Sequence, residues 1–340
     1  MAGAPQIPAY RIERSTRASR LALVGFAIAV ALLSSLPFWG GEDDLGSIVE
    51  ICYVLALAQC WNLLAGYAGL VSVGQQAFVG IGGYALFAFT ILVGLPPIPA
   101  VVLSGVVAAI LAFPTALVVF RLRGAYFAIG TWVVAEVFRG VMGQIPALGA
   151  GTGMSLPVAI SRAVAESRVG REIVLYYTGL AIAIGTILMV FFWLRSRQGL
   201  ALTAIRDSET AAGSVGVNGD RTKLAVYLIV ALATGMIGAL IYLEKLRISP
   251  DAAFDIIDWT ADIIFIVVIG GIGSIEGPFL GALVFFGLRS LLADYGAWYM
   301  ILLGAVAVIV MLRAPRGLWG LVSDRFEIQF FPVRRRVRLQ

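Results

Sequence analysis

The sequence predicts an all-α fold, a polytopic transmembrane helical bundle of about ten membrane segments with both termini cytoplasmic. Of its 340 residues, 60% are apolar and 13% are charged, whereas soluble globular chains average about 25% charged residues. A helix needs about 20 apolar residues to cross the hydrocarbon core of a membrane, and ten apolar runs are present. This composition excludes an ordinary cytosolic enzyme, and we expect no nucleic-acid partner.

The ten apolar runs follow one another with short polar breaks. In chain order they are 21–38, 46–64, 76–95, 98–120, 125–142, 173–194, 223–243, 259–272, 277–293 and 297–312. The first run follows several arginines but ends without a small-residue cleavage site, so we expect a retained crossing. Residues 1–20 are then a cytoplasmic N-terminal segment, 21–312 a single transmembrane domain, and 313–340 a basic cytoplasmic tail.

The placement of the basic residues orients the bundle. If the runs alternate from a cytoplasmic N-terminus, 18 of the 25 Lys and Arg residues are cytoplasmic, and seven lie outside or near a helix end. The positive-inside rule favours this arrangement. It makes the loop 195–222 cytoplasmic, and it places 143–172 and the acidic loop 244–258 outside.

Glycines interrupt two apolar segments at similar positions in the two halves of the chain. The segments are 66–83 and 270–281, and both contain Gly-x-x-Ser followed by Phe-x-Gly. Unwound backbone offers amide and carbonyl groups to a polar solute, so paired interruptions indicate a transport pathway. The alternative is that these glycines only permit close helix packing or turns. The candidate pathway residues are Gly69, Ser72, Gln75, Gln76, Gly271, Gly273 and Ser274.

Residues that carry catalytic chemistry are missing. Histidine is absent, and the chain has no phosphate-binding loop, nucleophile motif or metal-ligand spacing. We therefore expect no catalytic residue, no metal and no cofactor bound by this chain. Glu136 and Arg139, three apart on one helix face, are best explained as a mutually neutralising pair, with a solute contact as the alternative.

The cytoplasmic loop 195–222 has the most specific pattern. Leu202, Ile205 and Glu209 recur at helical spacing, and Gly216 with Asn218 is typical of a left-handed helix end. Small residues would let another protein approach closely, and charged residues would supply directional contacts. A solvated connector helix and a docking helix fit equally well. The candidate contact residues are Arg206, Asp207, Glu209, Ala211, Ala212 and Gly216.

This loop also carries a resemblance to a known family. Glu209-x-Ala211-Ala212-x-x-x-Gly216 is similar to the E-A-A…G loop of bacterial ABC importer permeases. Its surroundings resemble branched-chain amino acid permeases of the LivM type. Motifs at 66–74, 121–129, 249–250 and 270–278 occur in that family's order, so the resemblance covers nearly the whole chain.

The resemblance implies the permease subunit of an ATP-driven importer in the bacterial plasma membrane, for branched-chain or other apolar amino acids. Its implied partners are a second, related permease of the LivH type, two ABC ATPase subunits that use the ATP, and a periplasmic or lipid-tethered binding protein. The Arg206–Gly216 segment would be a coupling helix seated in an ATPase, and the outside loops would receive the binding protein. The tail, with Arg334, Arg335, Arg336 and Arg338, is expected to anchor on membrane lipid, or alternatively to contact the ATPase.

Two alternatives to this function stay open. Relatives commonly carry histidine where this chain has Gln75, and relatives with nearly the same pattern resemble importers of urea, short amides or aromatic acids. A stand-alone channel or secondary carrier is the alternative of another class. It would carry solute without partner subunits.

Overall fold

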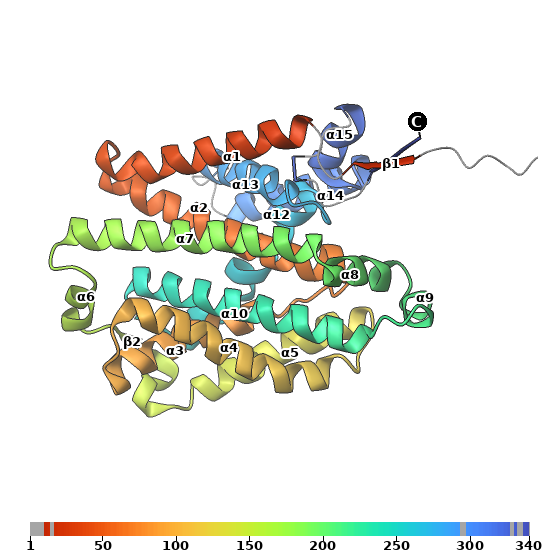
Figure 1. Cartoon of the computed structure of the whole chain (residues 1–340). Coiled ribbons are helices and arrows are strands. Elements are labelled where there is room, and N and C mark those ends of the chain that lie inside the picture. Colours follow the sequence, from red (N-terminus) through yellow and green to blue (C-terminus); the bar gives the residue numbers. More distant parts are fainter. Residues whose placement is uncertain (1–9, 14–16, 293–296, 327–329, 332–335, 340) are drawn as a thin grey trace, which may run out of the picture.

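Long apolar runs become long helices, and the computed structural model confirms the predicted all-α bundle (Figure 1). It describes residues 10–13, 17–292, 297–326, 330–331 and 336–339. In chain order the α-helices are α1 (Arg17–Ser35), α2 (Glu42–Asn62), α3 (Gln75–Phe87), α4 (Pro97–Val119), α5 (Ala125–Met142), α6 (Val158–Val164), α7 (Arg168–Arg195), α8 (Arg197–Asp207), α9 (Glu209–Ser214), α10 (Gly219–Lys245), α11 (Pro250–Ala253), α12 (Asp262–Gly270), α13 (Gly277–Leu292), α14 (Ala297–Arg313) and α15 (Gly317–Phe326).

Short helical turns and short strands complete the chain. The turns are η1 (Leu36–Phe38), η2 (Leu63–Tyr67), η3 (Ala88–Val93), η4 (Pro146–Leu148), η5 (Ala150–Thr152) and η6 (Ile257–Ala261). The strands are β1 (Tyr10–Glu13), β2 (Met154–Ser155), β3 (Arg247–Ile248) and β4 (Arg336–Leu339). Of these turns, η2, η3 and η6 are π-helical, a geometry frequently found at functional sites.

The chain is a multi-pass membrane protein. In the described part of the chain, eight helices are long and apolar enough to cross a membrane. They are Ser19–Phe38, Asp44–Tyr67, Gln75–Val93, Pro97–Val119, Ala125–Met142, Arg168–Arg195, Gly219–Lys245 and Ile301–Ser323. The other two predicted runs, 259–272 and 277–293, form α12 and α13, with nine and 16 residues. These two are shorter than a full span because the second glycine interruption separates them.

Close helix packing explains several glycines that lie within the helices. Helix α10 packs against α3 and α4, and α2 lies along α7 (Figure 1). A Cβ on Gly82 of α3 would collide with the carbonyl of Gly235 of α10, and a Cβ on Gly235 would collide with Ala108 of α4. In lipid, helices associate through van der Waals packing and not through the hydrophobic effect. Small residues let their backbones approach closely enough for this packing. At these positions the glycines serve close helix packing, which is the alternative to a transport pathway.

The two ends of the bundle carry the two kinds of loop that were predicted. At one end, β2 pairs antiparallel with β3, which joins the loops 143–172 and 244–258. At the other end lie α8 and α9, together with β1, which pairs with β4 (Figure 1). The terminal strands therefore share an end with the loop 195–222, as an even number of crossings requires.

Part of each terminal segment lies outside the described residues. This applies to 1–9 and 14–16 in the N-terminal segment, and to 327–329, 332–335 and 340 in the tail. Arg334 and Arg335 of the basic tail are among them, so the lipid anchor stays a prediction.

The predicted pairing of Glu136 with Arg139 is confirmed. Their ion pair spans 2.9 Å from Arg139 Nε to Glu136 Oε2, and Arg139 Nη1 also donates to Asp251 Oδ1 at 3.0 Å. This second contact ties α5 to α11 at the end that carries β2 and β3. The arginine is therefore a structural link between two helices.

Candidate functional site

The two glycine-interrupted segments meet in space. After η2 the chain leaves the helix and re-enters one at Gln75, and a second break separates α12 from α13. A Cβ on Gly66 in η2, just before the first break, would collide with the backbone of Gly273 in the second. Only a glycine allows this close approach of the two backbones.

Two amide side chains of α2 hold the second break. Asn62 Nδ2 donates to the carbonyl of Ser274 at 2.7 Å, and Asn62 Oδ1 accepts from the backbone N–H of Gly273 at 2.8 Å. Gln59 Nε2 donates to the carbonyl of Ile275 at 2.7 Å. Both side chains are fully buried. They satisfy backbone groups that an unwound stretch would otherwise leave without partners in the membrane.

Sequence reasoning missed both amides. Gln59 and Asn62 lie three positions apart in the second half of the apolar run 46–64, which leads into the first break. That spacing places two polar side chains on one helix face. It is the signal that could have found them.

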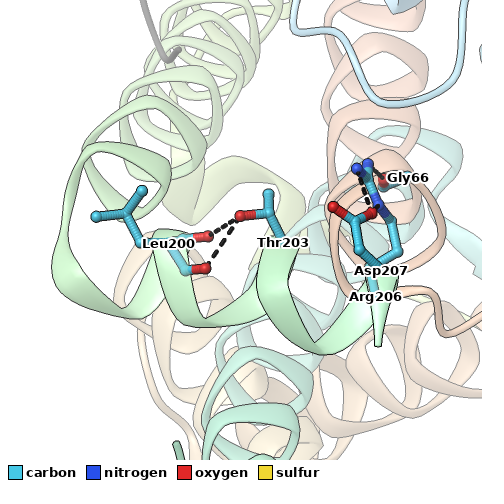
Figure 2. Close-up of polar contacts among 6 residues, drawn as sticks. Gly66, Leu200, Thr203, Arg206 and Asp207 are labelled. Carbon is cyan, nitrogen blue, oxygen red and sulfur yellow. Dashed lines mark hydrogen bonds and ion pairs between the residues drawn. The ribbon is translucent and has the colours of Figure 1, made fainter. Parts of the chain in front are cut away.

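Arg206 of α8 binds Gly66 (Figure 2) and lies close to Gly273 of the second break. Its Nη1 donates to the carbonyl of Gly66 at 2.8 Å, while Nε and Nη2 contact Asp207 Oδ1 at 3.0 and 2.9 Å. A Cβ on Gly273 would lie 3.7 Å from Nη1, and one on Gly69 would lie 3.4 Å from Arg206 Cγ. The side chain is 31% exposed. One guanidinium therefore joins the loop 195–222 to Gly66 through a charge-assisted hydrogen bond and lies beside Gly273.

The loop 195–222 forms two helices, so the expectation of one helix over Arg206–Gly216 is wrong. Helix α8 ends at Asp207 and α9 begins at Glu209. Ser208 between them is extended, with φ −162°, and its Oγ accepts a hydrogen bond from the N–H of Ala211 at 3.3 Å. Serine is a favoured N-cap, and here it ends one helix and starts the next.

Gly216 and Asn218, both predicted to end one helix, lie at the ends of two different helices. Gly216 has φ +87° and ends α9 in the left-handed region, as predicted. Asn218 instead starts α10, where its Oδ1 accepts from the N–H of Arg221 at 3.0 Å. Its predicted role was wrong because asparagine is also a strong N-cap.

The candidate contact residues of α9 differ in what they expose. Lys223 Nζ donates to Glu209 Oε1 at 2.6 Å, which fixes α9 to the start of α10. Ala212 is buried, at 3% exposure, and packs inward. Ala211 and Gly216 are exposed. Apart from the paired Glu209, the exposed residues of α9 are therefore small and uncharged.

Two clefts flank Arg206 and Asp207. A cleft of about 740 Å³ is lined by Gly273 and Ser274 of the second break, and a cleft of about 650 Å³ by Gly69 of the first. Ligand sites in proteins commonly measure about 300–1,000 Å³. Three of the candidate pathway residues thus line open space at this end of the bundle.

Three other pathway candidates lie inside the fold. Ser72, Gln75 and Gln76 are buried, and none of them is among the described residues that line the two clefts. Gln75 Nε2 donates to the carbonyl of Leu57 at 2.9 Å, and the side chain of Gln76 accepts from the hydroxyl of Thr260 in η6. Gln75 Oε1 and Gln76 Nε2 find no hydrogen-bond partner within the described part of the chain.

The chain after α15 holds the second break from its other side. Glu276 Oε1 accepts hydrogen bonds from the N–H groups of Phe330 and Phe331, at 3.0 and 2.8 Å. The carboxylate is 8% exposed, and a buried charge of this kind needs such donors. Gly271, the remaining candidate, has φ +133° and lies against the carbonyl of Arg316. The break is therefore held between α2 and the C-terminal segment.

Comparisons with known proteins support one class of protein. Residues 45–311 match the family described as "Branched-chain amino acid transport system / permease component". The high-affinity branched-chain amino acid transport system permease protein LivM of Escherichia coli (strain K12) is 28% identical over 94% of this chain and 79% of its own length. The LivM protein of Salmonella typhimurium (strain LT2) is 27% identical over the same shares. No solved structure matches.

Proposed function

Because this chain belongs to the family of permease components of branched-chain amino acid transport systems, we propose that it forms part of the membrane pathway of an ATP-driven importer. Members of the family are transport subunits and not enzymes. The observation that carries the proposal is the contact of Arg206 with Gly66, beside Gly273. It supplies a direct connection between α8 and the place where the two interrupted segments meet.

In the proposed mechanism α8 and α9 are the coupling element. Partner ATPases hydrolyse the ATP, and their closure moves α8 and α9 together with the start of α10. The contact between Arg206 and Gly66 passes that movement to the two breaks. A packed contact such as Gly66 against Gly273 favours two discrete arrangements over a continuous range. The pathway thereby switches between outward and inward access.

The proposed solutes are branched-chain amino acids. What supports them over urea, short amides or aromatic acids is the description of the matched family and the names of both LivM relatives. The same comparisons favour an ABC permease over a stand-alone channel or secondary carrier. We place the chain in the bacterial inner membrane.

The proposed partners occupy opposite ends of the bundle. One of the two ABC ATPases binds at α8 and α9, and a second permease of the LivH type lies beside the chain in the membrane. A substrate-binding protein docks on the loops 143–172 and 244–258, which support one another through β2 and β3.

The proposal is tested by purifying the chain from its native membrane and identifying the bound proteins by mass spectrometry. The purified assembly is then reconstituted in liposomes and assayed for uptake of radiolabelled leucine with and without ATP. We expect two ATPases and a second permease to copurify, and uptake to require ATP and the binding protein. A lone polypeptide that conducts leucine without ATP would overturn the proposal.

A further inference from the structure

A separate cavity lies at the end of the bundle opposite α8. Its volume is about 500 Å³, and residues of α2, η6, α12, α13 and α14 line it together with Lys245, the last residue of α10. None of the pathway candidates predicted from the sequence is among its described lining residues. The acidic loop 244–258 borders the cavity, because both Lys245 and Asp258 line it.

Charges of both signs line this cavity. Arg289 Nη1 pairs with Glu50 Oε1 at 2.6 Å, so these two charges neutralise each other in place. Lys245, Asp258 and Asp262 also line the cavity, and none of the three forms an ion pair within the described ranges. The cavity therefore offers one cation and two carboxylates to a ligand.

The surroundings of Asp258 favour a cation beside it. Burial is the first cause that raises the pKa of Asp258; the carboxylates of Asp255 and Glu50 raise it further, while Lys245 and Arg289 oppose this rise. A cationic group beside a partly buried carboxylate stabilises its charged form. The ammonium of Lys245 lies 4.7 Å from the centre of the Trp259 ring, which holds it near the cavity.

The remaining wall of the cavity is apolar. It contains Tyr53, Trp259, Phe265, Phe285 and Leu303, all of them buried. A mostly apolar pocket with a few well-placed charged groups is typical of small-molecule sites. The cavity therefore has an ammonium group that can bind an anion, two carboxylates that can bind a cation, and an apolar wall.

We propose that this cavity binds zwitterionic α-amino acids with an apolar side chain. Lys245 receives the α-carboxylate, Asp258 and Asp262 receive the α-ammonium, and the aromatic wall receives the side chain. A carboxylate alone or an amine alone leaves part of this charge unmatched, which weakens binding. The choice of amino acids as ligands rests on the proposed function. The cavity then lies directly below the proposed docking loops, where solute leaves the binding protein.

The test is ligand-observed NMR with the purified transporter complex, without its binding protein. Three probes are titrated: L-leucine, 4-methylpentanoate, which has only the carboxylate, and 3-methylbutylamine, which has only the ammonium. Lys245→Gln is expected to weaken leucine and 4-methylpentanoate about tenfold and to leave the amine unchanged. Asp262→Asn is expected to weaken leucine and the amine about tenfold and to leave the carboxylate unchanged, since each lost charged contact has that order of effect.

The control is Arg121→Gln, which removes an exposed cation on the short loop between α4 and α5. It should leave the affinity for all three probes unchanged. Equal weakening of all three probes in a cavity variant indicates a merely structural role and overturns the inference. Failure of leucine to bind the parent complex overturns it as well. If that complex, once its binding protein and ATP are supplied, still takes up leucine, the proposed function stands; if it does not, the function itself has failed.

Discussion

The guanidinium of Arg206 donates a hydrogen bond to the carbonyl of Gly66 at 2.8 Å, across 140 positions of sequence. Gly66 in turn touches the backbone of Gly273. One arginine of a surface helix thus reaches the place where two interrupted segments meet.

Replacing Arg206 with Ala should separate ATP hydrolysis from uptake. The change removes a charged hydrogen bond to a carbonyl that is in part buried, a contact whose loss costs about 1.5–3 kcal/mol. We expect ATP-dependent leucine uptake in proteoliposomes to fall at least about tenfold, while ATPase activity persists. Arg197→Ala, which removes an exposed arginine at the start of the same helix, is the control. Equal losses in both variants would argue against a specific role for Arg206.

Replacing Glu209 with Lys should also uncouple uptake. The change turns the 2.6 Å ion pair with Lys223 into a like-charge contact, which displaces α9 from α10. Because Glu209 is about half exposed, the pair adds little to overall stability, and the protein should stay in the membrane. The matched control is the charge reversal, Glu209→Lys with Lys223→Glu. Restored uptake in the double variant would confirm that the ion pair is needed for coupling. Unchanged uptake in the single variant would contradict that role.

Gly66→Ala should push the two breaks apart. The added methyl group collides with the backbone of Gly273, and overpacking of this kind costs about 1–3 kcal/mol. Gly46→Ala is the control, because a Cβ at Gly46 on the same helix meets open space. Thermal unfolding in detergent should show a lower midpoint for Gly66→Ala alone. Equal midpoints would mean that the breaks do not depend on this contact.

Removing the amides of α2 should release the second break in a graded way. Asn62→Leu loses two hydrogen bonds to the break, and Gln59→Leu loses one. A buried polar group left without a partner costs about 1–3 kcal/mol. We expect a larger decrease in the free energy of unfolding for Asn62→Leu, measured by denaturant titration in micelles. The reverse order would show that the amides do not act through these bonds.

Glu276→Ala should free the C-terminal segment. It removes the acceptor for the N–H groups of Phe330 and Phe331. Hydrogen exchange at these two amides should become faster, and Glu276→Gln, which keeps a carbonyl acceptor, should retain most of the protection. If both variants exchange like the parent protein, the bonds to Glu276 do not hold the segment.

Much of the fold could be predicted from the sequence because a membrane leaves few choices. Backbone groups in hydrocarbon must be paired within the segment, so an apolar run of about 20 residues becomes a helix. The same local logic gave the pairing of Glu136 with Arg139 and the left-handed conformation of Gly216. It erred at Asn218 and over 206–216, where two capping rules competed within a few residues.

The sequence by itself determined the class of fold, the order of the helices and the place of both interruptions, since each depends on neighbours along the chain. The tertiary structure alone decided that Gln59 and Asn62 hold the second break, that Arg206 reaches the first, and that Glu276 binds the C-terminal segment. Gln59 meets Ile275 across 216 positions. Hydrophobic periodicity says that a polar side chain is buried, but it does not say which distant carbonyl or amide will satisfy it. Only the packing of helices against one another makes that choice.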